Sequence, residues 1–557
     1  MSLILIVGCM LIALALGYRF YGRFIAAQYD LDDTKVTPAH RHEDGVDFVP
    51  TRPFYLFGQH FSAIAAAGPI AGPILAAQQF GWGPCLLWIG LGVIFIGAVH
   101  DFSTLVASVR HDARSIAEVV RIHLGQRAWL SLMVFIWVAL IYVIMAFTDL
   151  TAQTFVTGDA ELAGLTFTFN PGGAIAAASV SYLALALLMG LVVRVFKPAL
   201  WLTTLIFVPA TFAAVYGGTL ISTALVFEHQ TWVLLILGYC FIASLTPVWA
   251  LLQPRGYLGG FVLYSTLAVG VLGLVFGGFT TEQPAFVAFQ GTGTTGPLGF
   301  LFPFLFVTIA CGACSGFHGL VCSGTTSKQI ARETDCHPIG YGAMLLEGFV
   351  AVLALATLLV TDPSELAGKA PGAIFGAGLG RFLTVLIGDE ARLFAITFGA
   401  MAFSTFVFDT IDVCTRLGRY ALQELTGTSG RTSGLVSAAV TVGVPLFFLS
   451  FAAPGSYRLF WSIFGTSNQL LAGLSLLGIT VWLKRTGRRH AYTLVPMIFV
   501  MAVTLSALVL QIHQAFFGVA SGPVVVINGL VAVLLLALAV NLLREGFRAY
   551  RTPLSID

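Results

Sequence analysis

The sequence predicts an all-helical polytopic membrane protein with about fifteen transmembrane helices. Of its 557 residues, 57% are hydrophobic and only 10% are charged, whereas the charged share of a soluble protein is about 25%. Apolar runs of about 17 to 25 residues, long enough to span a bilayer, recur along the whole chain. Lys and Arg are concentrated in every second connection between these runs, as expected of cytoplasmic loops.

The apolar runs define the expected membrane segments. They lie near residues 3–19, 59–80, 84–108, 129–156, 174–195, 199–225, 230–252, 257–279, 298–323, 338–361, 391–415, 432–452, 458–483, 491–515 and 522–543. Segment 3–19 lacks a basic start, so we interpret it as a membrane anchor rather than a signal peptide. The chain is treated as a single membrane domain, 1–557.

The distribution of basic residues predicts the orientation. With the N-terminus outside, the connection between 230–252 and 257–279 is cytoplasmic and contains Arg255. Nearly all other Lys and Arg residues are then cytoplasmic too, and only Lys369, Arg381, Arg392 and Arg458 lie outside. The C-terminus is cytoplasmic in this arrangement. Any single miscounted segment would invert every later loop and remove the pattern.

Two of the segments carry helix-breaking residues near their middle. Segment 59–80 contains Gly68-Pro69 and Gly72-Pro73, and segment 298–323 contains Gly312 and Gly316. Proline removes a backbone hydrogen bond inside a helix. The sequence therefore predicts two discontinuous helices, although close packing or a simple kink is the alternative explanation for each.

Each predicted break opens a set of five segments. The chain divides into an extra helix at 3–19, a first repeat at 59–225, two intervening helices at 230–279, a second repeat at 298–483, and C-terminal helices at 491–543. Because each set has an odd number of spans, the two sets have opposite orientations. This is a 5+5 inverted repeat, an architecture in which secondary transporters place substrate and ion sites at broken helices.

Acidic residues inside the segments are candidates for proton handling, because an ionisable group in a membrane span is costly. Asp101, with His100 beside it, and Glu347 are the first candidates. Asp409 and Asp412 follow, and Asp412 stands four residues before Arg416, a spacing that suits an ion pair within the helix.

The breaks are the expected substrate site. The middle of the predicted spans holds carboxylates but no Lys or Arg, so an anionic substrate would depend on backbone amides and hydroxyls freed at the breaks. A substrate ammonium group could instead meet a carboxylate. The candidate substrate-binding residues are Gly68, Gly72, Gly312, Ser315, Gly316 and His318.

Other site classes have weaker support. Cys311, Cys314 and His318 share a helical face and could suggest a soft metal site, but a fourth ligand is missing, and membrane cysteines are usually packing residues. No Walker A pattern, nucleophile elbow or zinc-protease motif occurs. We therefore expect neither an enzyme nor a bound cofactor, and the net charge of +2 gives no indication of nucleic-acid binding.

Several long stretches resemble the carbon starvation protein A family of bacterial inner-membrane transporters. They read "VPTRPFYLFGQHFSAIAAAGPIAGPILAAQ", "GAVHDFSTLVASVRHDARSIAEV", "FPFLFVTIACGACSGFHGLVCSGTTSKQIARET", "IGYGAMLLEGFVAVLAL", "IDVCTRLGRYALQEL" and "WSIFGTSNQLLAG". The resemblance extends from about residue 17 to about residue 485. Departures are Gln59, where the family often has His, His100, where Gln is common, and Cys314, where no Cys is expected.

The resemblance implies uptake of peptides or pyruvate, driven by the proton gradient, and a five-plus-five fold related to the amino acid-polyamine-cation superfamily. The expected partners are the small-molecule substrate and the lipids of the bacterial inner membrane. Two alternatives stay open. Sodium could be the coupling ion, with Ser404 and Thr405 as oxygen ligands, or the chain could be a nutrient sensor that signals to a partner.

Overall fold

The computed structural model describes residues 1–45, 47–156, 169–291, 299–366, 368–518 and 522–552. Within these ranges the regular structure is helical, apart from three isolated β-bridges. The all-helical prediction is therefore confirmed for the described residues.

The number of long apolar helices is lower than predicted. In the described ranges, 12 helices are long and apolar enough to cross a membrane, or up to 13 if one bent helix pair counts as a span. The prediction of about fifteen is too high by this measure. The difference has two sources: segment 230–252 forms only the 17-residue helix α12, His229–Leu245, and segment 298–323 is divided into two short helices.

The chain divides into two compact units, each assembled from segments that are distant in sequence. Unit 1 comprises Met1–Val7, Leu140–Pro284 and Leu353–Phe460, and unit 2 comprises Gly8–Ala139, Ala285–Val352 and Trp461–Asp557. The unit boundaries fall inside four helices: α1 (Leu3–Leu16), α9 (Gln126–Phe155), α16 (Ala343–Leu359) and α20 (Tyr457–Arg485). These units do not coincide with the predicted repeats, 59–225 and 298–483, and the division into repeats stays a prediction.

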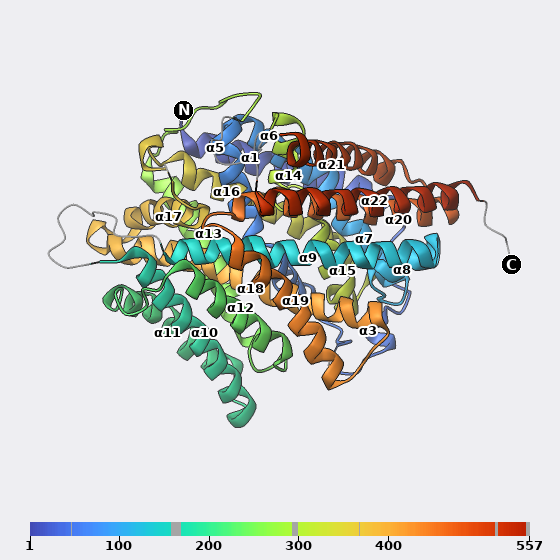
Figure 1. The fold of residues 1–557 in the computed structure, drawn as a ribbon. Helices are drawn as coiled ribbons and strands as arrows, with labels where there is room; N and C mark the ends of the chain where they lie inside the picture. Colours follow the sequence, from blue (N-terminus) through green and yellow to red (C-terminus); the bar gives the residue numbers. More distant parts are fainter. Residues whose placement is uncertain (46, 157–168, 292–298, 367, 519–521, 553–557) are drawn as a thin grey trace. The chain divides into compact units, whose positions relative to one another are not determined.

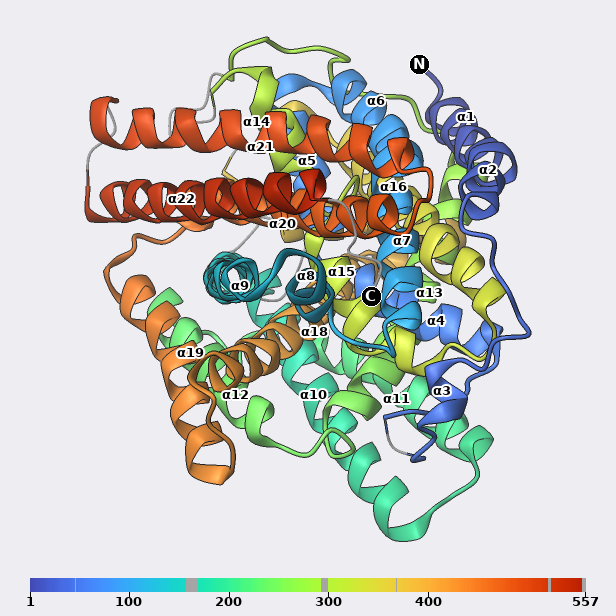
Figure 2. The same ribbon diagram turned by 90° about the vertical axis from the view of Figure 1, so that its right-hand side faces the viewer.

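Unit 1 contains helices that pack in pairs. These are α10 (Pro171–Phe196), α11 (Leu200–Leu220), α12 (His229–Leu245), α13 (Leu252–Gly277), α17 (Pro371–Ile387), α18 (Arg392–Thr426) and α19 (Arg431–Phe451). α10 and α11 run side by side, as Figures 1 and 2 show. α17 packs along α18.

Unit 2 carries both helix breaks. Its α-helices are α2 (Arg23–Ala27), α3 (Pro38–Arg41), α4 (Pro53–Ile64), α5 (Gly68–Phe80), α6 (Trp82–Gly92), α7 (Ala98–Arg110), α8 (Ile116–Leu124), α14 (Leu301–Thr308), α15 (Gly316–Gly324), α21 (Ala491–Phe517) and α22 (Pro523–Arg551). α21 and α22 lie side by side (Figures 1 and 2). α15 packs against α7.

Short irregular helices interrupt or join the longer ones. Three are π-helical, namely η1 (Gly17–Gly22), η2 (Val93–Gly97) and η5 (His337–Gly342), and four are 3₁₀, namely η3 (Thr326–Gln329), η4 (Glu333–Asp335), η6 (Pro363–Glu365) and η7 (Asp389–Ala391). η2 joins α6 to α7, and η5 leads into α16 and packs against α7. π-helical turns are often found at functional sites, and these two flank the helix that carries Asp101.

The first predicted break is present. α4 ends at Ile64, α5 begins at Gly68, and the two axes are bent by 44°. Pro69 stands in the first turn of α5, where its missing N–H has no intrahelical acceptor to lose. The first Gly-Pro pair therefore starts a helix instead of interrupting one, and only Pro73 lies inside.

The second predicted break is also present. α14 ends at Thr308 and α15 begins at Gly316, with irregular backbone between them. Such backbone leaves amide and carbonyl groups without intrahelical partners, which is tolerated at membrane depth only where protein or a polar cavity satisfies them. The partners of these groups are described with the candidate site.

Candidate functional site

Asp101 is fully buried on α7 and is held by two histidines. Nδ1 of His100 lies 2.7 Å from Oδ1 of Asp101, and Nδ1 of His318 lies 2.9 Å from Oδ2. His318 is carried by α15, so the contact joins the helix after the second break to the buried face of α7. Both carboxylate oxygens therefore accept from imidazole N–H groups.

Glu347 completes this arrangement from α16. Its Oε2 lies 3.2 Å from Nε2 of His318, and the side chain is fully buried. His318 thus stands between two carboxylates, one at each ring nitrogen. Only the imidazolium form can donate to both, so we name Asp101, His100, His318 and Glu347 the His318 network.

The ends of the His318 network have unused hydrogen-bonding capacity. In the described part of the chain, Nε2 of His100, Nε2 of His318 and both oxygens of Glu347 are buried without a partner at hydrogen-bond geometry, although Nε2 of His318 and Oε2 of Glu347 are in ion-pair contact. A Cβ at Gly319 would lie 3.2 Å from Cε1 of His100, so glycine at this position leaves room for the ring. A proton can enter or leave the network at Nε2 of His100 or at Oε1 of Glu347, because each can accept or donate one more bond.

His60 offers a contrast within unit 2. Its Nδ1 lies 2.9 Å from the hydroxyl of Thr326, and its Nε2 lies 4.0 Å from Sγ of Cys322. It is as buried as His318 but contacts no carboxylate at either ring nitrogen. We therefore interpret His60 as a buried histidine whose hydrogen bond to Thr326 is structural.

The two helix breaks lie against each other in unit 2. A Cβ at Gly68 would lie 2.7 Å from Cβ of Cys311, and a Cβ at Gly72 would lie 2.7 Å from the carbonyl oxygen of Thr308. Real side chains do not approach so closely, so glycine is required at both positions unless the neighbouring residues move. The two breaks therefore lie side by side, with the glycines acting as close-packing positions.

Gly312 and Gly316 are equally crowded. A Cβ at Gly312 would lie 2.8 Å from Cβ of Ala351, and a Cβ at Gly316 would lie 2.5 Å from the carbonyl oxygen of Asn468. These contacts agree with the alternative in which glycine permits close packing. They do not by themselves indicate a substrate.

The side-chain amide of Asn468 on α20 satisfies the start of α15. Its Oδ1 accepts from the backbone N–H of Phe317 at 2.9 Å, and its Nδ2 donates to Oγ of Ser315 at 3.0 Å and lies 3.2 Å from Sγ of Cys311. An anion binding to the Phe317 amide would therefore have to displace Asn468.

The same helix, α20, also satisfies the end of α14. Nε1 of Trp461 donates to the carbonyl of Thr308 at 3.1 Å, and Nε2 of Gln469 donates to the carbonyl of Phe306 at 3.3 Å. Asn468 and Gln469 therefore both form contacts between helices of unit 2.

Asp409 and Asp412 belong to a separate ionic cluster in unit 1. Nη2 of Arg255 lies 2.9 Å from Oδ1 of Asp409, and Nη1 lies 3.1 Å from Oδ2 of Asp412. We name these three residues the Arg255 cluster. Arg416 does not provide the expected partner of Asp412; its Nη2 donates to the backbone carbonyls of Ala243 and Thr246.

The sequence predicts Arg255 in a connection between two segments, but the structure places it in a helix. α13 begins at Leu252 instead of residue 257, so Arg255 lies in the first turns of the helix and is fully buried. The candidate span Leu252–Gly277 therefore contains an arginine near its start. The carboxylates of α18 compensate the buried guanidinium, a pairing that hydropathy alone could not show.

A second histidine–aspartate contact is found in unit 1. Nε2 of His229 lies 2.9 Å from Oδ1 of Asp149, and Oδ2 of Asp149 accepts from the backbone N–H of Tyr457 at 2.5 Å. Tyr457 is the first residue of α20. Asp149 therefore caps a helix start, and among the described residues His229 forms an ion pair with this one carboxylate.

The residues of the two alternative ion sites are bonded to other groups. The Ser404 hydroxyl lies 2.5 Å from that of Ser179, and the Thr405 hydroxyl donates to the sulfur of Met401 at 3.1 Å. Over the described ranges, no group of three or more His, Cys, Asp or Glu side chains is placed to hold a metal ion, and Cys314 is a buried free thiol. Neither the proposed sodium ligands, Ser404 and Thr405, nor the proposed metal ligands, Cys311, Cys314 and His318, include a carboxylate.

The long apolar helices define a multi-pass helical membrane protein. A family model described as "Carbon starvation protein CstA" matches residues 1–368 and 364–507. The chain belongs to this family of transporters, and the resemblance found in the sequence is confirmed.

Curated relatives support the assignment. The chain is 33% identical to the peptide transporter CstA of Escherichia coli K12, with 88% of this chain and 78% of the relative aligned. It is 32% identical to the pyruvate/proton symporter BtsT of the same organism, over 90% and 82%, and 32% identical to the peptide transporter CstA of Helicobacter pylori, over 89% and 80%.

Among solved structures, a manganese transporter of Eremococcus coleocola, in complex with an aromatic bis-isothiourea substituted compound, is similar at a TM-score of 0.44 and 13% identity. The match covers 94% of this chain and 99% of that structure.

Proposed function

We propose that this chain imports pyruvate or short peptides across the bacterial inner membrane by proton symport. The observation that carries the proposal is the His318 network, in which one buried imidazole stands between two buried carboxylates. The three side chains come from three different helices. Imidazole exchanges protons near neutral pH. Buried ionisable groups in membrane helices mark ion and proton pathways. One relative is named a pyruvate/proton symporter and others are named peptide transporters.

The coupling proton resides on His318 and moves to Asp101 or Glu347 during the cycle. Each transfer follows an existing contact of 2.9 or 3.2 Å, so no large displacement of the side chains is needed to begin it. His100 relays the proton from Asp101, because its Nδ1 already contacts the carboxylate. Asp409 and Asp412, which the sequence also suggested for coupling, have a guanidinium partner instead of an imidazole.

The substrate site is proposed at the two breaks, close to the His318 network. Ser315 and His318 provide the side-chain contacts, and the crowded glycines allow the two breaks to approach each other. Rearrangement of the Asn468 contacts would expose the Phe317 amide to a substrate carboxylate. The inverted 5+5 repeat, with the N-terminus outside and the C-terminus in the cytoplasm, supplies alternating access in this proposal.

The test is uptake of labelled pyruvate into proteoliposomes that hold the purified chain, under an imposed inward proton gradient. Di- and tripeptides serve as competitors, and a protonophore serves as the control for coupling. Pyruvate or peptide accumulation that collapses with the protonophore supports proton symport. Accumulation that follows a sodium gradient and ignores pH would select sodium coupling, and saturable binding without flux would select a sensor.

A further inference from the structure

Arg255 is the centre of a buried cluster with one excess negative charge. The side chain is 0% exposed, and its two contacts are with the carboxylates of Asp409 and Asp412 on α18. A guanidinium stays protonated in proteins, and burying it is costly unless acceptors surround it. Two carboxylates against one guanidinium leave a net charge of minus one when both acids are ionised.

The two carboxylates are held differently. Asp412 is 3% exposed and has a second partner, because the Tyr239 hydroxyl donates to its Oδ2 at 2.8 Å. Asp409 is 18% exposed, and its Oδ2 lies 2.9 Å from the position of a Cβ at Gly259. Asp412 is therefore a fixed partner of Arg255, whereas Asp409 has fewer constraints and is partly exposed.

The guanidinium has unused donors. Within the part of the chain that the structure describes, Nε, Nη1 and Nη2 of Arg255 all lack a partner at hydrogen-bond geometry, although two of them are in ion-pair contact. The Tyr182 hydroxyl donates to the backbone carbonyl of Arg255 at 2.7 Å and does not use the guanidinium. A planar fork of N–H groups is well suited to a second, bidentate carboxylate.

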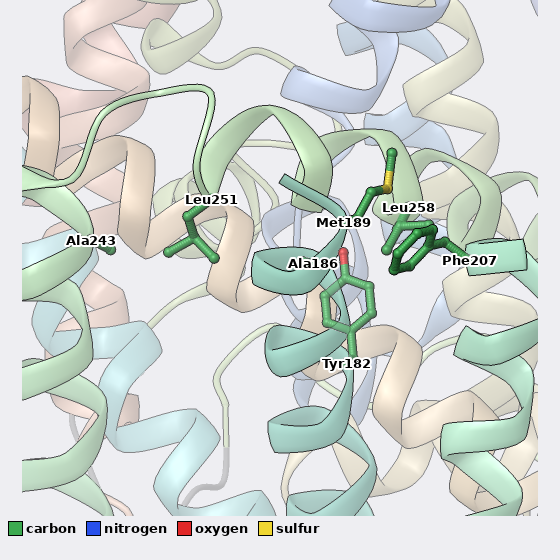
Figure 3. Packing of buried hydrophobic residues seen from close by; sticks show 7 residues of the cluster. All are labelled: Tyr182, Ala186, Met189, Phe207, Ala243, Leu251 and Leu258. Carbon is green, nitrogen blue, oxygen red and sulfur yellow. The ribbon is translucent and has the colours of Figure 1, made fainter. Parts of the chain in front are cut away.

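An apolar cluster adjoins the guanidinium along the chain. Leu251 precedes α13, and Leu258 follows Arg255 by three residues, so both are neighbours of Arg255 on the helix surface. Figure 3 shows the cluster, which comprises Tyr182, Ala186, Met189, Phe207, Ala243, Leu251 and Leu258. One cation beside apolar side chains suits a carboxylate with a short apolar body.

We propose that Arg255 binds the carboxylate of the transported molecule, and that Asp409 gives up its ion pair by taking a proton. The inference rests on the proposed function, assigns the substrate carboxylate to Arg255 in place of the Phe317 amide, and adds the substrate class: small carboxylates, either pyruvate or the C-terminal carboxylate of a short peptide. The proton adds to a carboxylate oxygen of Asp409, and the substrate carboxylate replaces that oxygen at Arg255. The net charge of the cluster stays at minus one, so the exchange adds no buried charge.

The exchange makes binding depend on pH. The charged and titratable groups that face Asp409 are Arg255 from α13, Asp412 on the same helix and the phenol of Tyr182 from α10. Tyr239 from α12 faces Asp412. The guanidinium and the phenols keep their protonation states near neutral pH. Carboxylate binding is therefore expected to strengthen as the pH falls, because protonation releases Asp409 from Arg255.

Calorimetric titration of the purified chain in detergent tests the inference without a proton gradient. Pyruvate and dialanine are the probes, and methyl pyruvate, which lacks the free carboxylate, is the ligand control. The double variant Arg255→Gln/Asp409→Asn keeps the net charge of the cluster at minus one. Loss of charge-assisted hydrogen bonds should weaken carboxylate binding about 10- to 100-fold in this variant.

Three further variants keep the test decisive. Arg255→Lys keeps the charge but loses the planar fork, so it should also weaken binding. Asp409→Asn imitates the protonated acid and should bind pyruvate at high pH as well as the parent chain does at low pH. Arg416→Gln is the matched control, because that arginine donates to the backbone carbonyls of Ala243 and Thr246 and not to the carboxylates of the cluster, and the affinity of this variant should equal that of the parent.

Unchanged affinity in Arg255→Gln/Asp409→Asn and in Arg255→Lys would overturn the inference and leave the cluster as a structural anchor. Equal binding of methyl pyruvate would also overturn it. Failure of proton coupling is recognised separately, since titration requires no coupling. A chain that binds carboxylates through Arg255 but follows a sodium gradient would contradict the proposed function and retain this inference.

Discussion

The His318 network of unit 2 and the Arg255 cluster of unit 1 each place two carboxylates around one cationic side chain. The difference lies in the cation. An imidazole changes its protonation near neutral pH, whereas a guanidinium stays charged. The same count of charges therefore supports two functions: the network can carry a proton, and the cluster can hold an anion. The predictions below test this separation, beginning with the largest expected effect.

Replacing both acids of the His318 network should abolish proton-driven uptake. In Asp101→Asn/Glu347→Gln, no carboxylate is left to exchange a proton with His318. Accumulation of labelled substrate in proteoliposomes should fall to the level of empty vesicles. Asp149→Asn is the matched control, since this acid caps α20 and its amide can still accept from Tyr457. Protonophore-sensitive accumulation by the double variant would exclude the network as the coupling device.

Removing the guanidinium alone should mainly lower stability. Arg255→Gln leaves two buried carboxylates without their cation, and breaking a buried ion pair costs about 3–5 kcal/mol. The free energy of unfolding, measured by denaturant titration of the purified protein, should fall accordingly. Arg255→Gln/Asp409→Asn should recover part of the loss. If Arg255→Gln is as stable as the parent, the ion pairs of Arg255 with Asp409 and Asp412 do not stabilise the fold.

A smaller effect is expected at the second break. Gly316→Ala would bring a Cβ within 2.5 Å of backbone atoms of α20, and overpacking of this kind costs about 1–3 kcal/mol. Gly324→Ala on the same helix is the control, because nothing lies within 4 Å of the added atom. Equal thermal stability of the two variants would show that the backbone at the second break moves enough to accommodate the added methyl group.

The smallest predicted effect is a pH dependence of stability outside the membrane segments. Nε2 of His123 on α8 lies 2.8 Å from Nε2 of His111. Burial, followed by the nearby His111 and Arg485, lowers the pKa of His123 to about 4. Its ordinary pKa is about 6.5. Between these values the unfolded chain binds a proton that the folded chain does not, so stability is lost as the pH falls from about 6.5 toward 4.

The check is the melting temperature of the parent and of His123→Gln as a function of pH. The parent should lose more stability than the variant on acidification through this range. Parallel curves for the two proteins would contradict the assignment to His123. The same titration provides a reference for His318, because His123 contacts another histidine whereas His318 contacts two carboxylates.

Much of the architecture follows from local sequence. The apolar runs give the helices, and Gly-Pro and Gly-rich stretches give both breaks, because hydropathy and backbone stiffness act over short distances. The number of spans was overestimated where an apolar run is long but its helix is short, as in α12, or where one run folds as two pieces, as in α14 and α15.

The ionic sites could be predicted only in part. Asp101 and Glu347 stand out because a carboxylate in an apolar run is costly. Their common partner, His318, is not visible from spacing, since the three lie on three helices. Arg255 was missed because it lies next to a predicted helix end, where a basic residue usually marks a loop.

The central claim is that His318 carries the coupling proton, and the most direct test is substrate-driven proton entry. Proteoliposomes containing a pH-sensitive dye receive the transported substrate with no imposed gradient, and lumenal pH is followed for the parent, His318→Gln and His60→Gln. The account predicts acidification by the parent and by His60→Gln, but none by His318→Gln, even where that variant still exchanges labelled substrate. Acidification by His318→Gln at the rate of the parent would contradict it.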